Sequence, residues 1–136
     1  MSLRAGNRLM GKETIHTDDG PPAAGAYSQA TTDGDLVFTA GQIASTPDGD
    51  PLSGEPIAVQ TERALDNLAA VLEAAGTDLG NVLKTTVYLA DIGDFDAMNE
   101  VYTGYFDAEP PARSAVQAGA LPLGMAVEIE AVATRP

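Results

Sequence analysis

The sequence predicts a single α+β domain, and three observations support this prediction. The chain has 136 residues, which is enough for one domain with a hydrophobic core. Segments typical of β-strands alternate with two segments of helical periodicity, and no internal repeat is present. The expected order is ββαβαββ, with two helices packed on one face of a sheet. We expect a disordered lead at residues 1–12 and one domain at residues 13–136.

The first two expected strands lie in the N-terminal third of the chain. Residues 13–17, ETIHT, alternate enough to form a short edge strand. A loop rich in proline and glycine, residues 18–26, follows and leads to Tyr27. Residues 35–43, DLVFTAGQI, are β-branched and aromatic, which predicts the second strand. Residues 45–54 are dense in turn-forming side chains and precede a helix.

Two helices are predicted from apolar residues that recur at three- and four-residue spacing. The first runs from Pro56 to about Ala75, before Gly76. Its apolar positions are Ile57, Ala64, Leu65, Leu68, Leu72 and Ala75. A strong strand at residues 81–90 follows, and Asp94 is the expected N-cap of the second helix. The apolar face of that helix comprises Phe95, Met98, Tyr102 and Tyr105.

Two further strands, at residues 113–118 and 125–134, close the chain. If they pair as an antiparallel hairpin, Arg113 lies opposite Glu128 or Glu130, depending on the register. One interpretation of such a pair is a structural ion pair at the sheet edge. The other is an arginine that binds a carboxylate, beside a glutamate that handles a water molecule.

Two helices can cover only one face of this sheet, so the other face needs a partner. The last strand places Val127, Ile129, Ala131 and Ala133 on one face and Val132 on the other. We expect the four-residue apolar face to be uncovered and to meet other copies of the chain. This predicts an oligomer with closed rotational symmetry.

Charge and composition exclude several classes of function. The chain carries seven Lys and Arg against twenty Asp and Glu, a net charge of −13. Such a surface repels phosphate groups, so we expect neither nucleic acid nor a membrane as a partner. An acidic, lysine-poor composition also favours solubility in concentrated salt, which raises the hypothesis of a halophilic source.

Metal and cofactor chemistry is not indicated either. The sequence has no cysteine, and His16 is its only histidine, so a metal site or a catalytic triad would depend on that residue alone. The glycines form neither a phosphate loop nor a dinucleotide fingerprint. We therefore expect no metal and no cofactor. No apolar run approaches about 18 residues, and no signal segment is evident, which predicts a cytoplasmic location.

Seven segments, in order, resemble the Rid/YjgF family, specifically its reactive intermediate deaminase branch. They are PPAAGAYSQA, FTAGQI, RALDNLAAVLEAAG, VLKTTVYLAD, DFDAMNEVY, PPARSAVQ and LPLGMAVEIEAVA, and the resemblance covers about residues 13–135. It implies a chorismate-mutase-like subunit in a homotrimer whose sheets form a central barrel, with active sites between subunits. It also implies hydrolysis of 2-imino acids such as 2-iminobutanoate to 2-keto acids and ammonia, without metal or cofactor.

The resemblance implies roles for individual residues. Arg113 would hold the substrate carboxylate with its planar guanidinium, and Glu128 would position and activate water. Glu130 would then be the structural acid. The other residues expected at the substrate are Tyr27, Ala40, Gly41 through its backbone, Asn99 and Ala115.

Three of these positions or their neighbours depart from the family pattern. Ala40 replaces a serine, Ala115 replaces a cysteine and Ala26 replaces a proline. Because the arginine and the glutamate are retained, these differences bear on substrate preference more than on activity.

Other interpretations remain open from the sequence. Spacing alone also permits Asn99 as a solvent-facing amide and Tyr27 as a packed aromatic. A non-catalytic trimer that binds a small carboxylate is the alternative function, although Glu128 favours an enzyme because a nearby carboxylate weakens anion binding. The endoribonuclease or translation-inhibitor role attached to the family suits this acidic chain poorly.

Overall fold

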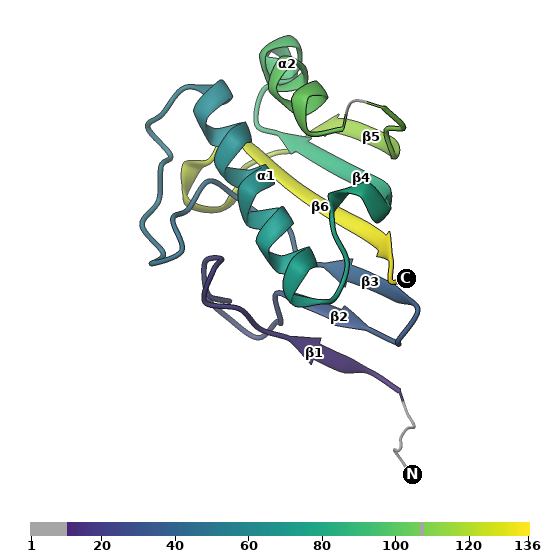
Figure 1. Ribbon diagram of the computed structural model, residues 1–136. Helices are drawn as coiled ribbons and strands as arrows, with labels where there is room; N and C mark the ends of the chain where they lie inside the picture. Colours follow the sequence, from purple (N-terminus) through teal and green to yellow (C-terminus); the bar gives the residue numbers. More distant parts are fainter. Residues whose placement is uncertain (1–10, 107) are drawn as a thin grey trace.

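The computed structural model describes residues 11–106 and 108–136, which form one six-stranded sheet and two long helices (Figure 1). The strands are β1 (Glu13–Ile15), β2 (Ala30–Thr32), β3 (Leu36–Thr39), β4 (Val82–Leu89), β5 (Ala112–Gln117) and β6 (Val127–Thr134). The helices are α1 (Ile57–Ala74) and α2 (Phe95–Tyr105), with short 3-10 turns η1 (Leu79–Asn81), η2 (Ile92–Asp94) and η3 (Pro122–Gly124). Of the expected lead at residues 1–12, all but the last two residues lie outside the described part.

The strand order across the sheet is β1-β2-β3-β6-β4-β5. Only β4 and β5 run parallel, and every other neighbouring pair is antiparallel. The α+β class with two helices on a sheet is therefore confirmed. The structure adds β2, a strand that the sequence analysis did not predict because three residues are too few to show an alternating pattern.

The last two strands do not pair as the hairpin that would bring Arg113 opposite Glu128 or Glu130. β4 lies between β5 and β6, so that Thr85 pairs with Arg113 on one side and Tyr88 pairs with Glu128 on the other. The chain from β4 to β5 passes through α2, and such a crossover returns the chain parallel to the strand it left. Arg113 and Glu128 therefore lie on strands that do not touch.

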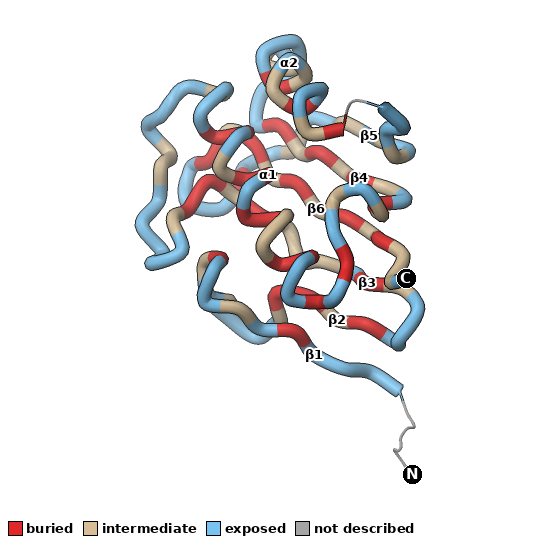
Figure 2. The backbone as a smooth tube through the Cα atoms, viewed as in Figure 1, coloured by how far each residue is buried: buried red, intermediate tan, exposed pale blue. Residues whose placement is uncertain are grey.

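Both helices cover the same face of the sheet, and the hydrophobic core lies between them and the strands (Figures 1 and 2). Most of the apolar stripe expected for α1 is fully buried, namely Ala64, Leu65, Leu68, Leu72 and Ala75. In α2, Met98 and Tyr102 are buried, and the hydroxyl of Tyr102 lies 2.7 Å from Thr85 Oγ1 of β4. Apolar burial thus holds both helices on the sheet, and the contact between Tyr102 and Thr85 adds a buried polar link between α2 and β4.

The expectation about the uncovered face is also wrong. Val127, Ile129, Ala131 and Ala133 are all buried in the core beneath the helices. The alternate residues of β6, including Glu128, Glu130 and Val132, occupy the open face instead. The open face also carries Phe38 and Tyr88 from the neighbouring strands β3 and β4. It is a mixed polar and apolar surface rather than the purely apolar one expected.

The start of α2 differs in detail from the expected cap. The helix begins immediately after Asp94, but the side chain of Asp94 makes no capping hydrogen bond. Asp91 caps the preceding turn instead, where its carboxylate accepts a hydrogen bond from Gly93 N at 2.8 Å. Neither helix of the described residues has the length and apolarity needed to cross a membrane.

Candidate active site

A cleft of about 300 Å³ opens beside Glu128 and is called the Glu128 cleft below. Its walls come from the loop before β2, the segment after β3, the turn η3 and strand β6. The lining residues are Tyr27, Ala40, Gly41, Ile43, Pro122 and Glu128. Four of the residues expected at the substrate, Tyr27, Ala40, Gly41 and Glu128, are thus together in one place.

Gly41 lies directly against the carboxylate of Glu128. The neighbouring residue Gln42 pairs with Ile129 of β6 through two backbone hydrogen bonds of 2.8 Å and 3.0 Å. This pairing brings Gly41 so close to β6 that a Cβ atom at position 41 would clash with the Glu128 carboxylate. Glycine leaves the space that this carboxylate occupies, and a larger residue would displace the carboxylate from its present position.

Glu128 and Glu130 differ in their electrostatic surroundings. Burial raises the pKa of Glu128 above its ordinary value, and the nearby Glu130 carboxylate raises it further. Glu130 accepts a hydrogen bond from the hydroxyl of Tyr88 at 3.3 Å. No side chain in the described part of the chain donates a hydrogen bond to Glu128. Glu128 is therefore a half-buried carboxylate whose oxygens are available to water or a ligand.

Tyr27 lies at the mouth of the Glu128 cleft and not in the core, because its side chain is 55% exposed. Its hydroxyl accepts a hydrogen bond from Ala24 N at 3.1 Å, which folds the ring back on its own loop. The buried amide of Gln29 fixes this loop through hydrogen bonds with Thr17 and with Pro21 O. The tyrosine therefore has a defined position at the cleft.

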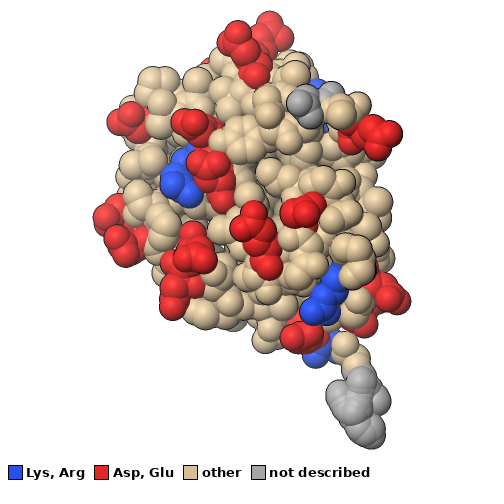
Figure 3. Space-filling model, in the orientation of Figure 1, with Lys and Arg blue, Asp and Glu red and all other residues tan. Residues whose placement is uncertain are grey.

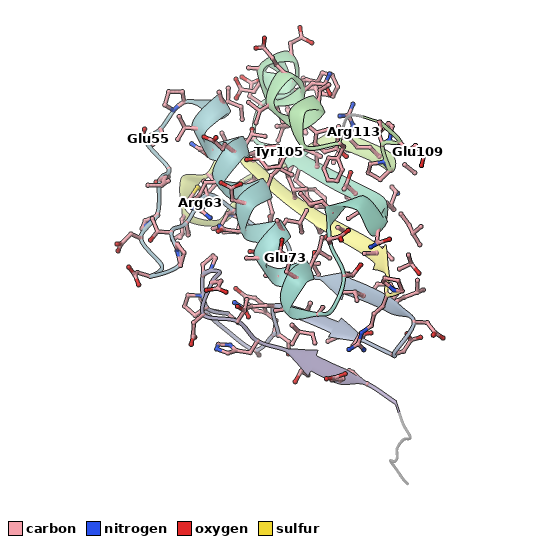
Figure 4. The ribbon with its side chains drawn as sticks, in the orientation of Figure 1. Glu55, Arg63, Glu73, Tyr105, Glu109 and Arg113 are labelled. Atoms are coloured by element: carbon pink, nitrogen blue, oxygen red, sulfur yellow. The ribbon has the colours of Figure 1, made fainter. Side chains whose placement is uncertain are left out.

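A second cleft, of about 380 Å³, lies beside Arg113 and is called the Arg113 cleft. It lies where α2 meets the edge strand β5, and Figure 4 labels Arg113 at this place. Arg113 Nη1 donates a hydrogen bond to Asn99 Oδ1 at 2.7 Å. The guanidinium lies over the rings of Tyr102, at 4.7 Å, and Phe95, at 5.2 Å. Cation–π contact and one hydrogen bond hold the group, and the remaining donors of its fork are available for an anion.

The two clefts are on opposite faces of the sheet within one chain. Arg113 pairs with Thr85, whose side chain is buried under the helices. Glu128 pairs with Tyr88, three residues further along β4, and an odd separation along a strand reverses the face. One chain therefore joins Asn99 to Arg113, but it does not bring either of them to Glu128.

Ala115 is found at neither the Glu128 cleft nor the Arg113 cleft. It lies on the same face of β5 as Arg113, two residues away. Its partly buried side chain packs against the hydrophobic core, and it is not among the residues that line either cleft. The sequence position thus identified the correct strand face but not contact with a cavity.

Sequence reasoning missed the residues that hold the two clefts in place. Phe95 and Tyr102 were expected only as apolar helix residues, yet they form the aromatic bed of Arg113. On α1, Gln60 Oε1 accepts a hydrogen bond from Ala126 N at 2.8 Å, two residues before Glu128. Asn67 Nδ2 donates to Ile43 O at 3.0 Å and to Ser45 O at 2.8 Å. The sequence did contain a sign of these contacts: Gln60 and Asn67 are polar amides, seven residues apart, on the side of α1 that is buried.

Acidic side chains are spread across the surface on the α1 side of the molecule, and Lys and Arg are few there (Figure 3). Arg63 is one of these few, and its Nε donates to Asn67 Oδ1 at 3.1 Å. On this face the exposed charge is therefore mainly negative, in agreement with the net charge of −13.

Comparison with known proteins places this chain among well-defined relatives. The family described as Endoribonuclease L-PSP matches residues 17–135. The chain is 45% identical to the 2-iminobutanoate/2-iminopropanoate deaminase of Rattus norvegicus, over 91% of this chain and 90% of the relative. It is 42% identical to the chloroplastic Reactive Intermediate Deaminase A of Arabidopsis thaliana, over 98% of this chain and 71% of the relative.

Solved structures agree with these sequence relatives. The crystal structure of yeast Mmf1 matches with a TM-score of 0.89 and 35% identity, over 92% of this chain and 99% of that chain. The structure of E. coli TdcF with bound serine matches with a TM-score of 0.86 and 39% identity, over 91% and 99% of the two chains.

Proposed function

This chain belongs to the Rid/YjgF family, and from that premise we propose that it hydrolyses reactive 2-imino acids to 2-keto acids and ammonia. The names of its relatives support an enzyme that acts on imines, since several are called 2-iminobutanoate/2-iminopropanoate deaminase. The proposal goes further in assigning the reaction to two residues of this chain. Arg113 binds the substrate carboxylate, and Glu128 activates the attacking water.

The observation that carries the proposal is the state of Glu128. A general base works best when its pKa lies between that of an ordinary carboxylate and the working pH, so that it takes a proton readily and returns it. Glu128 is half-buried beside a cleft, and its pKa is raised by burial and by Glu130. Among the acids of the described residues, it alone combines a raised pKa with a place in a cavity wall.

The proposed hydrolysis balances with water as the only co-reactant. Glu128 takes a proton from water as the oxygen adds to C2 of the protonated imine, and the C=N bond becomes a single bond. The proton then passes from Glu128 to the amine nitrogen of this tetrahedral intermediate. The C–N bond then breaks and ammonia leaves, while Glu128 takes the hydroxyl proton as that oxygen becomes the carbonyl of the 2-keto acid. Transfer of this proton to ammonia gives ammonium and restores ionised Glu128. The reaction as written requires no metal or redox cofactor.

The separation of the two clefts supports a site shared between chains. A 2-imino acid carries its carboxylate directly on C2, so the arginine and the base must lie within a few ångströms of the same small molecule. Within one chain these residues are on opposite faces of the sheet. We therefore infer that the Arg113 cleft of one subunit meets the Glu128 cleft of another in a homotrimer, the number three being the one that the family resemblance implies.

The test is a coupled assay in which a threonine dehydratase supplies 2-iminobutanoate and the release of 2-ketobutanoate is followed at limiting imine. Addition of the protein should accelerate keto-acid release well above the uncatalysed rate. Glu128→Gln keeps the shape of the side chain but removes the base, so the acceleration should fall by about 10²-fold or more. An unchanged rate on adding the wild-type protein would overturn the proposal.

The endoribonuclease activity in the family's description does not match the charge of this chain. RNA binding depends on Lys and Arg that neutralise phosphates. The acidic side chains in Figure 3 and the net charge of −13 would oppose such contacts. These observations favour a small substrate that reaches Arg113 over a polynucleotide.

A further inference from the structure

The buried face of β4 contains one polar side chain, and this residue pairs in register with Arg113. The buried residues of the strand are Val82, Thr85, Val87 and Leu89. Thr85 is fully buried, it pairs with Arg113 of β5, and it is not among the residues that line the Arg113 cleft. A hydroxyl in an apolar face loses its hydration, so it is unfavourable unless it gains a hydrogen bond. The threonine is therefore explained by the group that its hydroxyl binds.

That group is the hydroxyl of Tyr102 on α2, which lies 2.7 Å from Thr85 Oγ1. Tyr102 is 4% exposed, and its ring centroid lies 4.7 Å from that of Phe106, with 38° between the two planes. Burial raises the pKa of Tyr102, so the contact stays a hydrogen bond between two neutral hydroxyls. Thr85 at the hydroxyl and Phe106 beside the ring together fix the position and the tilt of this aromatic side chain.

The three groups that contact the guanidinium of Arg113 all come from α2. Phe95, Asn99 and Tyr102 follow one another at four- and three-residue spacing, so they lie on one face of the helix. A shift of α2 along the sheet, or a rotation about its axis, would move all three relative to Arg113 at once. The bond from Tyr102 to Thr85 opposes such a movement, because it ties α2 to the cross-strand neighbour of Arg113.

We propose that Thr85 is a positioning residue for the substrate carboxylate: through Tyr102 it sets the position of α2 against β5 and thereby orients the guanidinium of Arg113. This proposal rests on the proposed role of Arg113 and adds to it a residue outside the wall of the cleft. Orientation matters because a planar guanidinium binds a carboxylate through two parallel hydrogen bonds, and a small rotation removes one of them. The alternative is that the two hydroxyls only stabilise the packing of α2 on the sheet.

Three variants separate positioning from stability. Thr85→Val and Tyr102→Phe each leave the other hydroxyl buried without this partner, so each should be less stable than the wild type. The double variant replaces both residues with apolar groups of similar shape and should recover most of the lost stability. Thr86→Val makes the same change on the opposite face of β4 and serves as the control. Denaturant unfolding measures all four proteins against the wild type.

Binding of 2-ketobutanoate, measured by calorimetry, then distinguishes the two roles. Thr85→Val and the double variant should both bind it roughly fivefold more weakly than the wild type, because recovered stability does not restore the register of α2. In the coupled assay the loss should be found mainly in KM, since the carboxylate is held both before and during the reaction. A double variant that binds 2-ketobutanoate within twofold of the wild type would overturn the proposal.

The guanidinium of Arg113 also provides a measurement that does not depend on hydrolysis. Its Nε–Hε signal in a proton–nitrogen correlation spectrum, assigned by its loss in Arg113→Lys, should be shifted by the ring currents of Tyr102 and Phe95. The double variant should move this signal toward that of an arginine in a disordered peptide, whereas Thr86→Val should not. If the wild type hydrolyses no imine and binds no keto acid, the proposed function fails and this signal decides the role of Thr85. An unmoved signal in the double variant would then overturn it.

Discussion

Glu128 and Glu130 stand two residues apart on one strand, yet their surroundings give them different properties. Both are on the open face of β6, but Glu130 has a hydrogen-bond partner in Tyr88 and Glu128 lies against Gly41. Burial and the charge of Glu130 both raise the pKa of Glu128. In the proposed mechanism one glutamate is the base, and the other tunes it.

This difference predicts the pH dependence of the reaction. Activity requires ionised Glu128, so kcat/KM should fall as the pH falls through its raised pKa, at a pH above that of an ordinary glutamate. Glu130→Gln removes the neighbouring charge and should move this acid limb to lower pH while activity at neutral pH is largely retained. Burial is the larger cause of the shift, so the limb should not return fully to the ordinary value. A pH profile of kcat/KM for both proteins measures this, and an unmoved limb contradicts the coupling.

Arg113 depends on the planarity of its guanidinium as well as on its charge. The group lies over Tyr102 and Phe95 and donates to Asn99. Arg113→Lys keeps the charge but loses the fork and much of the aromatic contact, so kcat/KM should fall by roughly tenfold or more. Binding of 2-ketobutanoate, measured by calorimetry, should weaken in parallel. Near-wild-type turnover would count against a carboxylate clamp at this residue.

At the scale of elements, side chains of α1 hold two other segments in place, one after β3 and one before β6. Gln60 and Asn67 are buried on its sheet side, where they bind Ala126 N before β6 and the carbonyls of Ile43 and Ser45 after β3. The segment after β3 and strand β6 both contribute residues to the lining of the Glu128 cleft, namely Ile43 and Glu128. The helix therefore acts as a brace for the cleft through two side-chain amides.

Removing one amide of this brace tests its role. Asn67→Ala leaves two buried carbonyls without their side-chain donor and should lower the free energy of unfolding by about 1–3 kcal/mol. Denaturant unfolding measures the change, with Glu73→Ala, an exposed position on the same helix, as the control. The residual folded protein should also show a raised KM because the Ile43 wall is less fixed. Equal stability of the two variants would show that the brace is dispensable.

The sequence predicted individual helices and strands better than it predicted which strands lie side by side in the sheet. The stripe of Leu65, Leu68 and Leu72 was recognisable because helical periodicity is a local property. Strand order is not local, so the insertion of β4 between β5 and β6 was missed, and with it the separation of Arg113 from Glu128. The alternation of β6 was correct, but it could not show which of its two faces the helices cover.

The same limit applies to the candidate site. Family segments located Tyr27, Gly41 and Glu128, and the structure joins them in one cleft. The hydrogen bond of Asn99 to Arg113 depends on α2 packing beside β5, which spacing alone does not predict. The aromatic bed of Phe95 and Tyr102 was missed because these rings fit a helix core pattern equally well.

At the scale of the whole molecule, the two clefts lie on opposite faces of one chain, so we predict that activity requires an oligomer. Light scattering should give about three times the chain mass of 14.0 kDa. Two inactive variants, Arg113→Ala and Glu128→Gln, should regain part of the activity when they are unfolded together and reassembled, because some hybrid interfaces unite an intact Arg113 with an intact Glu128. Each variant reassembled alone provides the control. An active monomer, or hybrids without any activity, would contradict the shared site.

The contact between Gly41 and Glu128 has a consequence for how this sequence can evolve. A side chain of any size at position 41 would occupy the space of the Glu128 carboxylate. Mutations at the two positions are therefore not independent: a side chain at position 41 requires the flexible Glu128 carboxylate to leave its present place. Lineages that abandon the carboxylate are free to vary the glycine, whereas lineages that retain it in this position are not. A departure from glycine at this position is thus a mark, readable in a descendant sequence, that the carboxylate of residue 128 no longer occupies the place described here.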